Sequence, residues 1–121
     1  MSVALFTHPD MLAHRPGVGH PESPERLQAV LDALDAADLG LDRRAATEAA
    51  VADLERLHPA DHVARILAAA PDSGLRQLDA DTVLSPGSVR APRLAAGAVV
   101  DAVRAVARGE TARAFAAVRP P

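Results

Sequence analysis

The sequence predicts an α/β layer fold whose first and last strands are parallel. Three observations support this fold class. An apolar run with β-branched and aromatic members, residues 2–7, opens the chain, and a second apolar run, residues 112–118, closes it. Between the two runs, apolar residues recur at helical spacing in several stretches. The order strand, helices, strand is typical of α/β folds with a parallel sheet.

The composition bounds the class of protein. At 121 residues, the chain has the size of one small domain with a modest core, and its net charge of −3 argues against direct binding to nucleic acid. It has no cysteine, which excludes thiolate metal sites and suits a reducing cytoplasm. We recognise no signal peptide and no apolar stretch near the roughly 20 residues that span a bilayer. The sequence therefore predicts a cytoplasmic protein that binds neither nucleic acid nor membrane.

The first strand leads into a long loop and a helix. Residues 8–22 carry three prolines, two glycines and three histidines, a composition that predicts an extended ordered loop. Ser23 is a good N-cap, and Pro24 suits the first helical position. Apolar residues then follow at helical spacing (Leu27, Val30, Leu31 and Leu34), and we expect this helix to end at Gly40.

The middle of the chain predicts two short helical stretches and a loop. Helical spacing begins near Thr47, restarts at Pro59 and ends at Pro71. A polar loop extends from there to Leu78 and leads into an acidic turn.

The last helix is the longest. It follows the turn at residues 85–88 and is expected to run to about Gly109. Its polar side chains form one stripe, so we expect the other sides to be covered. Small residues such as Gly97 let the helix lie close against a sheet, although glycine costs up to about 1 kcal/mol in helix propensity. Pro92 is tolerable only near the start of this helix.

Two motifs carry the chemical information. Residues 20–26 (His-Pro-Glu-Ser-Pro-Glu-Arg) form a rigid loop that enters a helix, and by its position alone Arg26 is an ordinary surface charge. Residues 114–121 (Ala-Phe-Ala-Ala-Val-Arg-Pro-Pro) form a buried strand that ends in a polar turn. In an open α/β sheet such a turn faces the ligand crevice at the carboxyl ends of the strands.

These motifs, with Asp81-Thr82 and the Ala-Ala-Gly step ending at Gly97 at matching distances, resemble the zinc-dependent deacetylases. That superfamily includes histone deacetylases, acetylpolyamine amidohydrolases and acetoin-utilisation proteins. The resemblance implies an arginase-like three-layer α/β/α fold with a parallel sheet, incomplete in this chain. Because Arg-Pro-Pro is followed by Gly-His-His in that family, it also implies that residues 1–121 are the N-terminal segment of one deacetylase domain, truncated before the catalytic histidines.

The resemblance implies a hydrolase that removes acetyl groups from acetyl-lysine or acetylated amines by zinc-activated water. It places Arg26 in an inner cavity that receives the released acetate, and Asp81 at the rim, where its carboxylate accepts hydrogen bonds from substrate amides. A guanidinium suits acetate because it stays charged and offers forked donors. Glu22 and His20 are interpreted as holding the loop in place.

The family's zinc ligands, two aspartates and a histidine, lie on later strands, and no residue of this chain corresponds to them. We therefore expect the isolated chain to be inactive, and its missing partner to be the C-terminal part of its own domain. Protein lysine, polyamine and small metabolite all remain open as the acylated substrate.

Three other interpretations stay open at this point. Asp79 and Asp81 form a D-x-D-x-V pattern similar to haloacid-dehalogenase-type phosphatases, although residues 74–78 make a poor preceding strand. A loop aspartate that caps a turn explains Asp81 equally well. His58 and His62 have the i, i+4 spacing of a helical metal site, but no third ligand is evident, and capping explains them better. The alternative function is a stand-alone partner-binding module with an exposed apolar helix face.

Overall fold

A parallel sheet lies at the centre of the computed structural model, which describes residues 2–121. Its strand order is β2-β1-β5, with β1 (Ala4–Thr7) between β2 (Asp42–Ala45) and β5 (Ala114–Ala116). Both neighbours run parallel to β1, with Ala4 in register with Asp42 and with Ala114. The predicted α/β class and the parallel arrangement of the first and last strands are thus confirmed.

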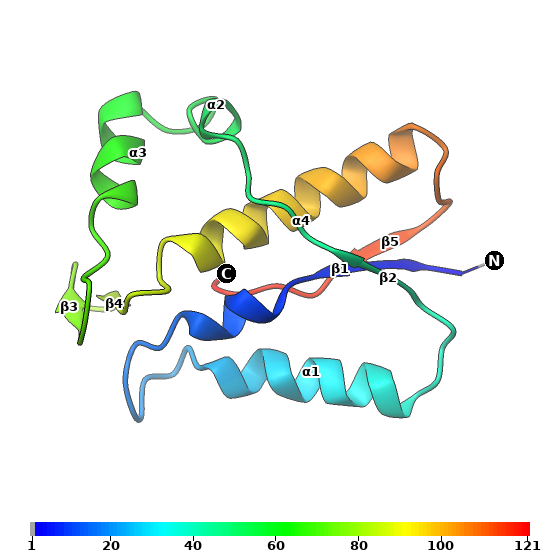
Figure 1. Ribbon diagram of the computed structural model, residues 1–121, viewed down its shortest axis with the longest axis horizontal. Coiled ribbons are helices and arrows are strands. Elements are labelled where there is room, and N and C mark those ends of the chain that lie inside the picture. The colour runs from blue at the N-terminus through cyan, green and yellow to red at the C-terminus, as the bar shows by residue number, and fades with distance from the viewer. Residues whose placement is uncertain (1) are drawn as a thin grey trace.

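Helices lie on both sides of this sheet. Figure 1 shows α1 (Pro24–Ala36) below the sheet and α4 (Arg90–Ala107) above it. The remaining elements are η1 (Pro9–Ala13), α2 (Val51–Leu54), α3 (Ala60–Leu67), and the antiparallel pair β3 (Arg76–Gln77) and β4 (Val83–Leu84). Within residues 2–121, no helix is both long and apolar enough to cross a membrane.

The helix boundaries differ from the sequence prediction in detail. α1 ends at Ala36, with Gly40 in a left-handed turn beyond it, and Ser23 occupies the N-cap position without a side-chain capping bond. Pro92 is the third residue of α4. An amide at that position has no partner within the helix, so proline costs little there.

The core is built largely from alanine. Its buried members come from the sheet, the loop and both long helices: Ala4, Leu5, Phe6, Met11, Leu27, Ala46, Leu94, Ala98, Ala102, Ala105 and Ala117. Small side chains let α4 pack closely on β1 and β5, but each buries little apolar area. Met11 of η1 and Leu27 of α1 therefore contribute large side chains to this core.

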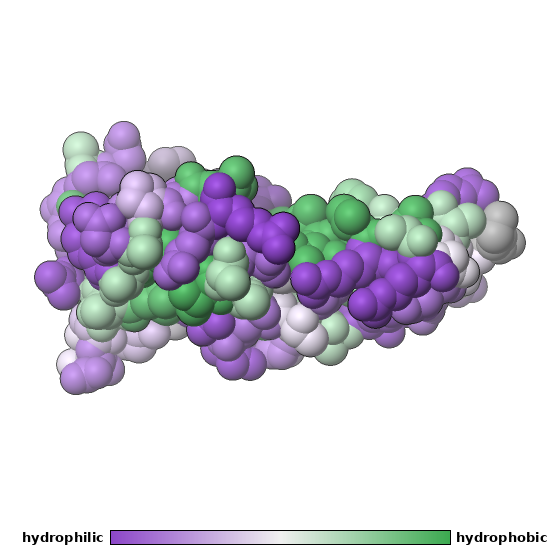
Figure 2. Space-filling view, turned by 90° about the horizontal axis from the view of Figure 1, so that it is seen from above, coloured by the Kyte–Doolittle hydropathy of each residue, from purple (hydrophilic) through white to green (hydrophobic). Residues whose placement is uncertain are grey.

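One side of α4 is uncovered, contrary to the expectation from its polar stripe. Val99, Val103 and Val106 are 49%, 63% and 42% exposed, beside Phe115 on the neighbouring strand β5, which is 51% exposed. Figure 2, viewed from the α2–α4 side, shows hydrophobic surface along the half of the molecule where α4 ends. α4 therefore carries more apolar side chains than the other elements of residues 2–121 cover.

Candidate functional site at the carboxyl edge of the sheet

The carboxyl ends of β1 and β5 open into the two loops that carry the sequence motifs. Thr7 ends β1, and its hydroxyl donates to the carbonyl of Ala117 at 2.8 Å, which joins the starts of the two loops. Residues 8–22 and 117–121 therefore leave the sheet side by side. This edge is where open α/β sheets bind their ligands.

Arg119 is the centre of a buried polar cluster that it forms with Glu22 and His14. Its side chain has 0% exposure. The guanidinium donates from Nε to Glu22 at 3.1 Å and from Nη2 to the other Glu22 oxygen, a bidentate pair. Its Nη1 donates to the carbonyls of Met11 at 2.7 Å and His14 at 2.6 Å. One side chain thus ties the end of β5 to both halves of the loop.

His14 connects this cluster to the turn before α4. Its Nδ1 lies 2.6 Å from the hydroxyl oxygen of Ser88, and its Nε2 lies 3.6 Å from Glu22. The order Ser88, His14, Glu22 resembles a nucleophile with its base and orienting acid. Ser88 is only 4% exposed, however, and its hydroxyl also accepts the amide hydrogen of Ser85 at 2.7 Å. The contact is therefore structural, since substrate has no access to the oxygen.

Burial lowers the pKa of His14 below its usual value of 6.5, and the neighbouring charge of Arg119 lowers it further, against the opposing effect of Glu22. The neutral ring is thus favoured in the folded chain, whereas the unfolded chain takes up a proton near pH 6.5. The unfolded state then binds more protons below that pH, so the free energy of unfolding should fall as the solution is acidified.

We expect acidification to lower the free energy of unfolding by less in the variant His14→Gln, which removes the titrating ring. Urea unfolding between about pH 8 and pH 5, compared for the two proteins, measures the difference. His58→Gln, which removes a histidine ring at an exposed position, is the matched control. Equal slopes for the wild type and His14→Gln would contradict a role for His14 titration.

Arg26 lies beside the same cluster and is half exposed. Its Nη2 donates to the carbonyl of Val118 at 2.8 Å, and its Nε lies 4.0 Å from Glu22. The first turn of α1 thereby contacts the segment that follows β5. These contacts do not test whether Arg26 faces an inner cavity that receives acetate, so that role stays a prediction.

Asp81 lies in the turn between β3 and β4, and the first of these strands falls within the polar loop predicted for residues 71–78. Its residue is exposed, and its carbonyl accepts a hydrogen bond from Nε2 of His20 at 3.0 Å. His20 thus joins the loop to the hairpin, and Glu22 pairs with Arg119. The interpretation of His20 and Glu22 as residues that hold the loop is confirmed by these contacts.

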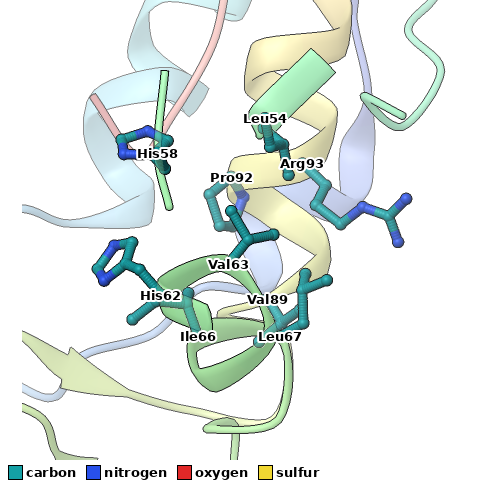
Figure 3. A pocket seen from close by; sticks show the side chains of 9 residues that line it. All are labelled: Leu54, His58, His62, Val63, Ile66, Leu67, Val89, Pro92 and Arg93. Atoms are coloured by element: carbon teal, nitrogen blue, oxygen red, sulfur yellow. The ribbon is translucent and has the colours of Figure 1, made fainter. Parts of the chain in front are cut away.

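A separate apolar pocket lies between α2, α3 and the start of α4. Figure 3 shows its lining: Leu54, His58, His62, Val63, Ile66, Leu67, Val89, Pro92 and Arg93. The rings of His58 and His62 lie 5.5 Å apart, and Arg65 donates to Nδ1 of His62 at 3.1 Å. None of the motif residues lines this pocket.

Metal ligation can be tested on the donor set that is present. Within residues 2–121, no group of three or more His, Asp or Glu side chains is arranged to hold a metal ion. Arg119 occupies the Glu22 carboxylate, and the Ser88 hydroxyl lies against His14, so the buried polar groups already have partners. These residues do not fit a zinc centre.

Fold and site together define an α/β protein with a polar site at the carboxyl edge of a parallel sheet. Residues 20–121 match the sequence profile described as "Histone deacetylase domain". A histone deacetylase-like amidohydrolase of Pseudomonas aeruginosa is 39% identical over 105 residues, which are 85% of this chain and 27% of that protein. A probable deacetylase of Archaeoglobus fulgidus is 29% identical over 125 residues, with 100% of this chain and 34% of that protein covered. The chain belongs to the histone deacetylase family.

A solved structure agrees with this assignment. The crystal structure of the HDA15 HD domain superposes with a TM-score of 0.90 at 30% identity, over 99% of this chain and 35% of that one. The family resemblance found in the sequence and the fold inferred from it are confirmed. The chain spans about a third or less of the length of the relatives that it matches.

Sequence reasoning missed the roles of three residues in the site. Arg119 was noted as part of a motif, but its pairing with Glu22 spans 97 positions and has no local signal. The contact of His14 with Ser88 spans 74 positions, so it has no local signal in the sequence either. Asp79 accepts the amide hydrogen of Asp81, and the acidic turn itself was the only available clue.

Proposed function

We propose that this chain is the N-terminal segment of a deacetylase domain that hydrolyses the amide of acetyl-lysine or of another acetylated amine, and that residues 2–121 alone have no activity. The observation that carries the proposal is the family match over residues 20–121 in a chain that spans about a third or less of its relatives. The zinc ion and its ligands, with the catalytic histidines, belong in this proposal to the rest of the domain. A cytoplasmic location is part of the same proposal.

The uncovered side of α4 supports the assignment to a larger domain. Beside Val99, Val103 and Val106 lies β5, which pairs with β1 along one edge and has no partner strand on its other edge within residues 2–121. Parallel sheets are normally covered on both faces and seldom end in such an open, apolar region. A further parallel strand with its helix would fill both places.

Two residues of this segment act on substrate or product in the proposal. Asp81, exposed on the β3–β4 turn, accepts hydrogen bonds from the amide groups of the substrate. Arg26 keeps half of its side chain exposed while one nitrogen donates to Val118, which leaves donors for the carboxylate of acetate. The competing interpretation of Asp79 and Asp81 as a phosphatase motif lacks support, because Asp79 follows the two-residue strand β3 and a single residue.

The proposal is tested with an acetyl-lysine peptide as substrate. We expect no turnover by the 121-residue chain and zinc-dependent turnover by the complete domain. In the complete domain, Asp81→Ala should raise KM by about tenfold, the effect of losing one or two hydrogen bonds to substrate. Asp72→Ala, an exposed acidic residue outside the turn, is the control and should leave KM unchanged.

A stand-alone partner-binding module is the second candidate, because the apolar side of α4 is also what a partner surface would present. This candidate requires a chain that stays monomeric without a partner. Sedimentation of the 121-residue chain separates the two functions. Self-association of the chain favours the domain segment, whereas a stable monomer favours the module.

A further inference from the structure

We propose that His20 and Asp79 are positioning residues for Asp81. They hold the peptide groups on either side of it and thereby fix the direction in which its carboxylate leaves the turn. The inference rests on the rim role proposed for Asp81 above and adds to it the residues that set its geometry.

His20 is held at both ring nitrogens. Its Nδ1 lies 3.1 Å from the amide nitrogen of Glu22, and its Nε2 lies 3.0 Å from the carbonyl oxygen of Asp81. An amide nitrogen can only donate and a carbonyl oxygen can only accept, so Nδ1 carries no hydrogen and Nε2 carries one. The neutral ring with its hydrogen on Nε2 is the one form that makes both bonds. The carbonyl of Asp81 is thus fixed from the loop side.

Asp79 holds the other peptide group. Its Oδ1 accepts the amide hydrogen of Asp81 at 2.9 Å. This bond, together with the contacts to Thr82, lowers the pKa of Asp79 because hydrogen bonds to a carboxylate favour its charged form. The carbonyl of Thr82 in turn accepts the amide hydrogen of Leu78 at 2.8 Å and closes the turn. Both peptide groups of Asp81 therefore have a fixed partner.

Little else restrains this turn. Residues 72–81 are all exposed, and the two strands of the hairpin are two residues long each. Packing therefore contributes little to the conformation of the turn. A turn that is mobile before binding would lose conformational entropy each time it binds a substrate. Bonds from His20 and Asp79 supply that order before binding, which is the general advantage of a preorganised site.

The anchor for His20 is the buried cluster. His20 receives its hydrogen bond from the backbone of Glu22, whose side chain forms the bidentate pair with Arg119. A continuous series of contacts runs from the fully buried guanidinium through Glu22 and His20 to Asp81. The position of the rim is thereby tied to the end of β5.

The contact itself is tested by nitrogen-15 NMR on the complete deacetylase domain. We expect the ring of His20 to show the tautomer with hydrogen on Nε2, and a scalar coupling across the bond to the Asp81 carbonyl. His20→Phe should shift the Asp81 and Thr82 resonances. His8→Phe is a matched control, since His8 accepts the amide hydrogen of Asp10 two residues on, at 3.1 Å, in the same loop. The opposite tautomer of His20, or unshifted hairpin resonances in His20→Phe, would overturn the proposal.

The consequence for substrate is tested in the complete deacetylase domain. We expect His20→Phe and Asp79→Ala each to raise KM by about tenfold while kcat changes by less than about twofold, because a misplaced rim weakens binding and leaves the chemistry intact. Asp79→Asn keeps the accepting oxygen and should restore KM, and His8→Phe should leave it unchanged. Wild-type KM in both His20→Phe and Asp79→Ala, alongside a raised KM in Asp81→Ala, would sink the positioning roles.

Failure of the proposed function looks different. If Asp81→Ala leaves KM unchanged, Asp81 is not a rim residue, and the function assigned to it is wrong. The NMR experiment then still decides whether His20 and Asp79 order the turn. If every variant has a lower kcat, a higher KM and a lower stability to the same extent, the residues have a general structural role, and the proposal is overturned as well.

Discussion

Replacing Arg119 with methionine should destabilise the chain by about 3–5 kcal/mol, the cost of breaking a buried ion pair by removing one partner. Arg119 is fully buried, and its loss leaves the carboxylate of Glu22, 19% exposed, without its guanidinium. Two carbonyls, those of Met11 and His14, lose their donor at the same time. Since a domain of this size has only about 5–15 kcal/mol of stability, the loss would be between about a fifth and all of it.

Urea unfolding followed by circular dichroism measures this loss, because the chain has neither Trp nor Tyr to report by fluorescence. Arg119→Lys should fall between wild type and Arg119→Met, since one ammonium cannot replace a fork that bonds a carboxylate and two carbonyls together. Arg43→Ala is the control: its ion pair with Asp35 is exposed and should be worth less than about 1 kcal/mol.

The double variant Glu22→Leu with Arg119→Met tests the cause. Removing both partners also removes the unpaired carboxylate, so it should be more stable than Arg119→Met alone. If Arg119→Met unfolds at the same urea concentration as Arg43→Ala, the buried ion pair of Arg119 with Glu22 does not stabilise the chain as described.

The apolar runs of the sequence predict β1 and β5, whereas nothing in the sequence predicts the polar edge strand β2. β1 is buried almost throughout, and its apolar run marks it as a strand. β2, by contrast, has the polar sequence Asp-Arg-Arg-Ala. It lies at the edge of the sheet, where Arg44 is half-buried and the other three residues are exposed. What makes β2 a strand is its pairing with β1, and pairing leaves no periodicity in the sequence.

The candidate site was predicted to the same limited extent. The resemblance located the motifs at residues 20–26 and 114–121, and the structure places both at the carboxyl edge of the sheet. How the motifs meet depends on side chains 97 positions apart, Glu22 and Arg119, that fold topology alone brings together. The same holds for the contact of His20 with Asp81, 61 positions away. Distances of this kind follow from the three-dimensional packing of loops, which local sequence rules do not describe.

Gly97 is the second position where a single change should have a large effect, and the expected sign is opposite to that of helix propensity. In an exposed helix, alanine is about 1 kcal/mol better than glycine. A Cβ at Gly97, however, would lie 1.7 Å from the carbonyl oxygen of Thr47 and 2.8 Å from the amide nitrogen of Ala49. No rotamer relieves this overlap, because both partners are backbone atoms.

The segment that Gly97 meets is fixed on either side of the contact, one helical turn away in each direction. The amide of Ala49 donates to the carbonyl of Arg93 at 2.9 Å, and the amide and hydroxyl of Thr47 donate to Asp101 at 2.9 and 2.8 Å. Residues 93, 97 and 101 lie on one face of α4, so the segment cannot move from Gly97 without breaking these bonds. The predicted close approach at Gly97 is confirmed, but the partner is the segment at residues 47–49 that follows β2, and not the sheet itself.

Gly97→Ala should therefore lower the free energy of unfolding by about 3 kcal/mol or more, at the upper end of overpacking effects. Urea unfolding gives the value, and Ala33→Gly, at an exposed position in α1, calibrates the propensity contribution at about 1 kcal/mol. Combining Gly97→Ala with Asp101→Ala should cost less than the sum of the two single variants, since a segment released from Asp101 can move away from the new methyl group. A chain stabilised by Gly97→Ala would show instead that α4 and residues 47–49 are not in close contact. The connection between β2 and α2 would then have to leave the sheet by a different path from the one described.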